Sequence, residues 1–164
     1  MVIASVVACV VMATARSNGL VAVTVTATDP KAEPVDHVLP LVKQHESLPD
    51  YELVIEMTRD RTQYLGTKPN ESAVNGLSWR LNDPVSLAEI ATVRLREKDK
   101  VISDELAEVH VTAASVTSNG YRFDFQTTQS FGLGVRAFFV TPIGMAISGA
   151  FFLGVLLLVV SKLA

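Results

Sequence analysis

Cysteine and positive charge are both scarce in this chain. Its 164 residues include a single cysteine, Cys9, and 14 lysines and arginines against 17 aspartates and glutamates, for a formal net charge of −3. With one cysteine the chain has no internal disulfide, so any domain is held together by packing. A mildly acidic chain without a basic cluster is not expected to bind nucleic acid or to attach to anionic lipid by charge alone.

Motifs for catalysis and metal binding are also missing. The three histidines, His37, His45 and His110, are scattered, and none has a cysteine or carboxylate at the spacing of a zinc site. The sequence contains no Gly-x-Ser-x-Gly nucleophile motif, no Walker phosphate loop and no Gly-x-Gly-x-x-Gly motif. We therefore expect that the protein is not an enzyme.

The most prominent feature that is present is a long apolar segment near the end of the chain. Residues 137–160 contain no charged side chain and lie between Arg136 and Lys162. A helix of this length extends on the order of 30 Å, which matches the hydrocarbon core of a bilayer. The segment predicts one transmembrane helix, followed by a short cytosolic tail at 161–164.

Small residues spaced four apart share one face of this predicted helix: Ala146, Ala150 and Gly154. Such faces let a second membrane helix approach closely, although small residues are also common in membrane helices without a partner. The expected partners of the segment are membrane lipid and other membrane-protein subunits.

A shorter apolar segment occupies residues 1–15. It is too short to cross a bilayer, and it ends in Ala13-Thr14-Ala15, the small-x-small pattern of a signal-peptidase site. A cleaved signal peptide would place residues 16–130 on the lumenal, extracellular or periplasmic side. In a eukaryotic secretory route, Asn70 would be the acceptor of an Asn-x-Ser glycosylation sequon.

The region between the two apolar ends shows the two-residue periodicity of half-buried strands. Apolar and polar residues alternate in segments separated by turn signals: 20–28, 51–57, 62–67, 76–81, 91–96, 107–112 and 121–127. Many short strands at regular spacing predict an all-β antiparallel sandwich of seven to eight strands, with a linker at 131–136 before the helix. Trp79 and the stripe of Tyr121, Phe123 and Phe125 are expected in its core.

Acidic residues gather in three predicted connections of the sandwich. If the strands alternate up and down, connections 29–50, 68–75 and 97–105 emerge at the same end, which we call the acidic pole.

The direction of the last strand decides whether the acidic pole faces the bilayer. A last strand through Thr127 that runs toward the acidic pole would hold that pole near the bilayer, whereas one further strand through 131–135 would turn it away.

Several segments resemble the C2-domain family. Residues 49–55, Asp-Tyr-Glu-Leu-Val-Ile after Pro49, look like a conserved strand of that family, and Leu65-Gly66-Thr67-Lys68 followed by Trp79 looks like its next strands. Residues 93–99 followed by 104–109 are similar to its third calcium loop and the strand after it. The resemblance covers roughly 20–125 and implies a C2-like sandwich that binds lipid or protein, with or without calcium.

Carried over by position, the resemblance implies a calcium site. Its ligands would be Asp50, Glu97, Asp99 and Asp104, with Asp29 as a possible ligand from the first connection. Calcium prefers about six to eight oxygen ligands, often from carboxylates on separate loops. The alternative is that these carboxylates form a solvated polar rim, as loops at the ends of sandwiches commonly do.

Together these observations predict a non-enzymatic single-pass membrane protein whose exported C2-like sandwich is a binding or accessory module. Two alternatives stay open. The protein could be a structural subunit of a larger membrane complex, similar to accessory subunits of translocation machinery and docked through its helix. It could also bind lipid or protein with the help of calcium at the acidic pole.

Overall fold

A computed structural model describes residues 17–34, 48–58, 60–98, 103–139 and 141–163. The predicted signal peptide, 1–15, and the predicted calcium ligand Asp99 lie outside the described residues. The chain divides into two compact units, of which one is Leu20–Thr128 and the other combines Met1–Gly19 with Gln129–Ala164.

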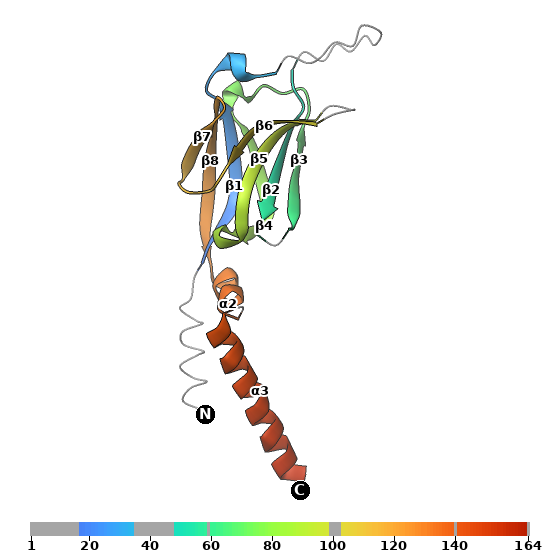
Figure 1. Cartoon of the computed structure of the whole chain (residues 1–164), viewed down its shortest axis with the longest axis vertical. Helices are drawn as coiled ribbons and strands as arrows, with labels where there is room; N and C mark the ends of the chain where they lie inside the picture. Colours follow the sequence, from blue (N-terminus) through green and yellow to red (C-terminus); the bar gives the residue numbers. More distant parts are fainter. Residues whose placement is uncertain (1–16, 35–47, 59, 99–102, 140, 164) are drawn as a thin grey trace. The chain divides into compact units, whose positions relative to one another are not determined.

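Eight strands form two four-stranded antiparallel sheets, as the sequence predicts (Figure 1). The first sheet has the order β4-β1-β8-β7, with β1 Ser17–Ala27, β4 Leu77–Ser86, β7 Ser115–Ser118 and β8 Tyr121–Ser130. The second has the order β3-β2-β5-β6, with β2 Tyr51–Met57, β3 Thr62–Lys68, β5 Ile90–Lys98 and β6 Ser103–Val109. Short 3-10 turns, η1 Pro30–Ala32, η2 Ala73–Asn75 and η3 Leu87–Glu89, lie in three connections.

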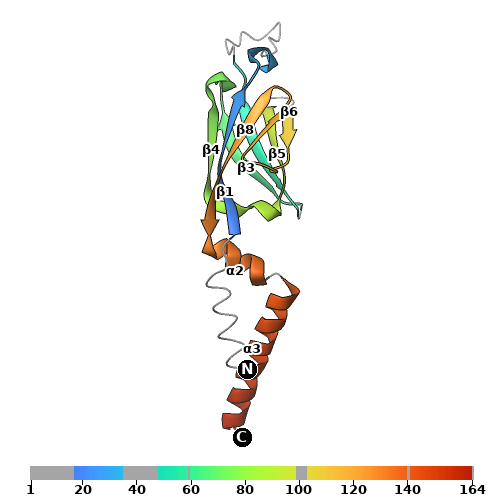
Figure 2. The same cartoon turned by 90° about the vertical axis from the view of Figure 1, so that its left-hand side faces the viewer.

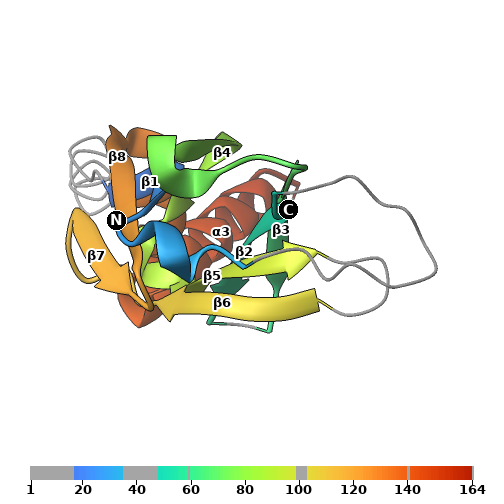
Figure 3. The same cartoon turned by 90° about the horizontal axis from the view of Figure 1, so that it is seen from above.

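The two sheets face each other as layers (Figures 2 and 3) and bury one apolar core between them. The predicted aromatic core is confirmed, since Trp79 is 3% exposed and Tyr121, Phe123 and Phe125 are all buried. The alternation in β1 shifts by one residue near its start, where Leu20 is buried and Val21 half-buried, because the adjacent residues Ala22 and Val23 are both buried.

The hairpin of β7 and β8 was not predicted, and it reverses the direction of the last strand. Ser118 pairs with Tyr121, so the loop is Asn119-Gly120, with φ angles of 47° and 80°. Two successive positive φ angles in a two-residue loop define a type I′ turn, which favours Asn-Gly. The extra strand β7 means that β8 begins at the acidic pole and leaves the sandwich at the other end.

The C-terminal unit contains two helices instead of one. Helix α2, Phe131–Phe139, begins directly after β8, so the expected linker 131–136 is helical. Helix α3, Pro142–Leu163, follows a break, and the axes of α2 and α3 differ by 81°, so the segment 137–160 is divided between them. Over the described chain, no single helix has the length and hydropathy of a membrane span, and Phe131–Phe139 with Pro142–Leu156 has them only as a bent pair.

Candidate functional site

The predicted acidic connections do meet at one end of the sandwich. Glu33 in the first connection accepts hydrogen bonds from the Ser72 hydroxyl and the Ala73 N–H in the second. The backbone oxygen of Asp50, at the end of the first connection, accepts a 2.8 Å hydrogen bond from the Lys98 N–H at the end of β5. The described parts of these connections are therefore joined by hydrogen bonds, although they are far apart in sequence.

The carboxylate of Glu33 is the centre of the polar contacts at this pole. The Ser72 hydroxyl lies 3.1 and 3.0 Å from its two oxygens, and the Tyr51 hydroxyl donates to Oε1 at 3.1 Å. The backbone N–H of Ala73 is a third donor to Oε1. A buried hydrogen-bond donor without an acceptor lowers the stability of the fold. Because Glu33 accepts from donors in β2 and η2, it holds the first connection against these two elements.

Below Glu33 lies a pair of buried tyrosines. The hydroxyl oxygens of Tyr51 and Tyr121 are 3.4 Å apart, and their rings meet edge to face with centroids 6.2 Å apart. Burial raises the pKa of Tyr51 above its ordinary value, with further contributions from the hydrogen bond to Tyr121 and from Glu33. Burial likewise raises the pKa of Tyr121. Both hydroxyls therefore stay protonated near neutral pH and act as hydrogen-bond donors.

Asp50 has a structural role beside this network. Its Oδ1 accepts a 2.7 Å hydrogen bond from the backbone N–H of Asn70, in the turn after β3. The side-chain oxygen of Asn70 in turn accepts from the Leu48 N–H at 3.3 Å. Asn70 is exposed and has a φ of 50°, and its side-chain nitrogen has no partner in the described part of the chain. Within the described chain, the sequon nitrogen is therefore free at the surface of the pole.

The predicted calcium ligands are only partly brought together. Glu97 and Asp104 were expected in a loop but are cross-strand partners in β5 and β6, where Glu97 is 7% exposed and Asp104 is exposed. Asp29 accepts from the backbone of η1, and Asp50 is engaged as described above. Among the residues that the structure describes, no group of three or more His, Cys, Asp or Glu side chains could hold a metal ion. Because Asp99 is outside these residues, the calcium site stays a prediction.

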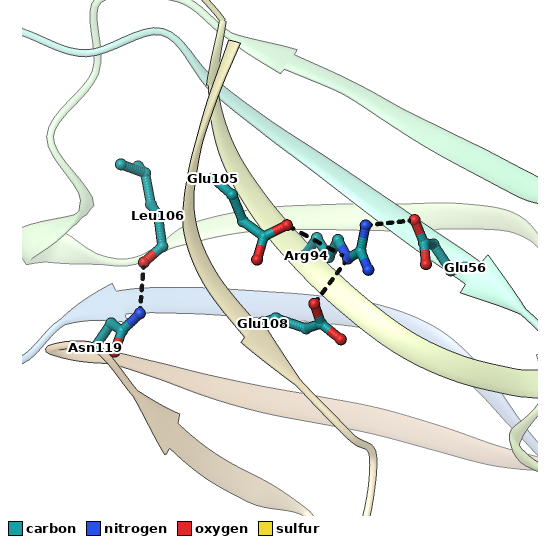
Figure 4. Close-up of polar contacts among 6 residues, drawn as sticks. All are labelled: Glu56, Arg94, Glu105, Leu106, Glu108 and Asn119. Atoms are coloured by element: carbon teal, nitrogen blue, oxygen red, sulfur yellow. Dashed lines mark hydrogen bonds and ion pairs between the residues drawn. The ribbon is translucent and has the colours of Figure 1, made fainter.

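A charged network covers the outer face of the second sheet (Figure 4). The Arg94 guanidinium lies 2.8 Å from Glu56, 3.0 Å from Glu108 and 3.5 Å from Glu105, which come from the strands on either side of β5. Partly exposed ion pairs of this kind contribute up to about 1 kcal/mol each. The network ties β2, β5 and β6 together, and sequence periodicity alone did not identify it.

A small cavity of about 180 Å³ lies at the end of the sandwich opposite the acidic pole. Its lining is apolar or hydroxyl-bearing and includes no ionisable group: Leu87, Val111, Thr112, Ala113, Ala114, Phe125 and Thr127. Acid-base catalysis requires an ionisable side chain within hydrogen-bonding reach of a substrate. These lining residues offer none.

Helix α3 carries the predicted contact face and a much larger apolar surface. Ala146 and Ala150 are exposed and Gly154 is half-buried, all on one side of the helix. Large exposed apolar side chains occur all around the helix: Ile143, Met145, Phe151, Phe152, Leu153, Val155, Leu156, Val159 and Val160. At 3.6 residues per turn, these positions surround the whole helix axis.

No protein-family model, curated protein or solved structure matches this chain. The resemblance to C2 domains therefore rests on the short sequence segments alone, while the structure supports the broader class of a two-sheet antiparallel sandwich.

Proposed function

We propose that this chain is a non-enzymatic, single-pass membrane protein whose β-sandwich lies outside the cytosol as a binding or accessory module. The apolar surface of α3 is the observation that carries the proposal. A helix that is apolar on every side is stable inside a protein core or in lipid. Phe152 in the middle of α3 is 70% exposed and Ile143 is 68% exposed, so within the described chain no core covers them.

The length of α3 agrees with lipid as the cover. Counted to Leu163, α3 has 22 residues and is about 33 Å long, against about 30 Å for the hydrocarbon core of a bilayer; counted to Leu156, it has the length and hydropathy of a span only together with α2. Proline at its first position and glycines inside it are tolerated in membrane helices. A span formed by α3 would be five residues shorter at its start than the predicted helix 137–160.

The architecture of the sandwich supports a binding role for the acidic pole. β8 starts at this pole with Tyr121 and leaves the sandwich at the other end, after about 25 Å of strand to Thr128. The chain therefore continues to the anchor from the end opposite the pole. Within the described part of the pole, hydrogen bonds hold Glu33 and Asp50 near the two ends of the first connection, and groups fixed in this way lose less entropy on binding.

Alkaline extraction of membranes tests the anchor. We expect the tagged full-length chain to stay in the membrane pellet at high pH and to be released by detergent. The double variant Phe152→Asp/Leu153→Asp should be lost from the pellet, since each aspartate at a helix centre costs about 3 kcal/mol of insertion. Tyr64→Asp is the matched control, because Tyr64 is 61% exposed on β3. A wild-type chain released without detergent would contradict the proposal.

A second candidate is a structural subunit of a larger membrane complex, and the face of Ala146, Ala150 and Gly154 favours it. Replacing Ala150 with leucine should then reduce co-purification with a partner subunit. Ser148→Leu is a suitable control, because it adds similar bulk on nearly the opposite side of α3. Equal recovery of the partner with both variants would count against this candidate.

A further inference from the structure

The bend between α2 and α3 is built by specific side chains. The backbone N–H and the hydroxyl of Thr141 both donate to the Phe138 carbonyl oxygen, at 3.0 and 2.7 Å. The same hydroxyl accepts from the Gly144 N–H at 3.1 Å, and the Thr141 carbonyl accepts from the Met145 N–H at 2.9 Å. Thr141 thus closes α2 and caps the start of α3, with Pro142 at the first helical position.

Gly144 allows the two helices to approach each other at this bend. A Cβ atom at position 144 would collide with the carbonyl oxygen and carbon of Phe138 and would crowd the backbone of Phe139. Any larger residue would therefore force α2 and α3 apart. Gly149, further along α3, shows the contrast, since a Cβ there would meet nothing within 4 Å.

Helix α2 has the size and surface of a helix that lies on a membrane. Its nine residues correspond to about 13 Å, far less than a bilayer core. Phe131 and Phe139 at its two ends are 50% and 40% exposed and lie roughly 80° apart around the axis. Arg136 is also exposed. Exposed aromatic and arginine side chains on a short helix are typical of the interface between lipid headgroups and acyl chains.

We infer that α2 is an interfacial helix that lies along the membrane surface while α3 crosses the bilayer, with Thr141 and Gly144 setting the angle. This inference rests on the proposed function, because it requires α3 to be a span. If α3 tilts by about 20° from the membrane normal, the 81° bend places α2 within roughly 30° of the membrane plane.

Depth measurements with spin labels test this geometry. The full-length chain with Cys9→Ser would carry single cysteines at Phe131, Phe139, Ile143, Phe152 or Val159, all of which are exposed. After reconstitution into vesicles of equal parts phosphatidylcholine and phosphatidylglycerol, oxygen and a water-soluble nickel complex report the depth of each label. We expect labels at 131 and 139 to differ in depth by less than about 6 Å, and the α3 labels to deepen from 143 to 152 by about 13 Å.

The possible outcomes separate the inference from the proposed function. Labels on α3 that stay accessible to the nickel complex would contradict the membrane span itself. Inserted α3 labels with a difference of about 12 Å between 131 and 139 would show that both helices enter the bilayer as a broken span, and would overturn the inference alone. Labels at 131 and 139 that neither reagent reaches would show a protein contact in place of lipid, and would overturn it as well.

Two glycine variants test whether the bend is the cause. Gly144→Ala should increase the depth difference between labels at 131 and 139, because the new Cβ displaces Phe138. Gly149→Ala should leave that difference unchanged, because its Cβ meets open space. An equal effect of the two variants would contradict the role assigned to Gly144.

Discussion

Removing the Glu33 carboxylate should destabilise the sandwich more than any other change at the acidic pole that leaves the apolar core intact. Glu33→Ala takes the acceptor away from the Tyr51 hydroxyl, the Ser72 hydroxyl and the Ala73 N–H. A buried donor left unpaired costs about 1 to 3 kcal/mol. The buried Ala73 N–H meets that cost in full and the buried Tyr51 hydroxyl, which keeps the Tyr121 hydroxyl at 3.4 Å, meets part of it, whereas Ser72 is half-buried and regains water. The expected loss is therefore about 2 to 4 kcal/mol.

Thermal unfolding of the full-length chain in detergent measures this loss, because the only tryptophan, Trp79, is 3% exposed in the core and reports unfolding by fluorescence. A domain of this size loses about 4 °C of Tm per kcal/mol, so Tm should fall by roughly 10 °C. Glu71→Ala is the control at the same pole, since that side chain is exposed and makes no hydrogen bond within the described chain. It should change stability by less than about 0.5 kcal/mol.

A double-mutant cycle then isolates the hydrogen bond between Glu33 and Tyr51. Tyr51→Phe removes the hydroxyl and leaves the buried ring in place. Direct partners show coupling energies of about 0.5 to 3 kcal/mol. If Glu33→Ala costs no more than Glu71→Ala, or if the coupling with Tyr51→Phe is zero, then Glu33 does not hold the first connection as described.

Three further predictions concern ionisation, modification and calcium. The folded state raises the pKa of Tyr51 and Tyr121 above their unfolded value of 10.0, so their contribution to stability is complete below pH 10 and is lost as the pH rises further. We therefore expect Tm to fall above pH 10. An equal fall of Tm in the Tyr51→Phe variant would refute this prediction. In a eukaryotic secretory host, Asn70 should carry a glycan that a glycosidase removes and that Asn70→Gln abolishes. The control for export is Pro84→Thr, which creates a second sequon at the exposed Asn82. A glycan at Asn82 without one at Asn70 would contradict the prediction. Millimolar calcium should leave Tm unchanged because Asp50 is already engaged, whereas a rise that Asp104→Asn abolishes would support the calcium site.

Most strands could be predicted because each has one buried and one exposed face. The segment 51–57 coincides with β2, and Trp79 and Phe123 lie in the core as their alternation indicates. β7 was missed because it has only four residues, with Val116 as its single large apolar side chain. The Asn119-Gly120 dipeptide was the available signal, since it favours a two-residue hairpin and therefore requires a strand before it as well as after it.

The start of α3 was also present in the sequence. The predicted helix 137–160 includes Thr141-Pro142, but threonine at the cap and proline at the first position mark a helix start. Proline also disfavours helical geometry in the residue before it, which is why the apolar segment breaks there. Hydropathy alone does not detect such a break, because the residues on both sides are equally apolar.

The role of Glu33 could not be predicted in the same way. Its partners Ser72 and Ala73 are 39 and 40 residues away, and nothing in the local pattern distinguishes Glu33 from other acidic residues of the first connection. Contacts of this kind depend on how two sheets bring their connections together. The predicted common pole located the region, and the side-chain geometry identified the residue.

The central claim, that α3 crosses a membrane with the sandwich outside the cytosol, is tested most directly by labelling from one side. The full-length chain with Cys9→Ser would carry a cysteine either at the exposed Asn82 on β4 or after Ala164. A membrane-impermeant maleimide should label the cysteine at position 82 only from the extracellular, periplasmic or lumenal side of the intact membrane, and the C-terminal cysteine only from the cytosolic side. Labelling of both cysteines from the same side of the intact membrane would contradict the account.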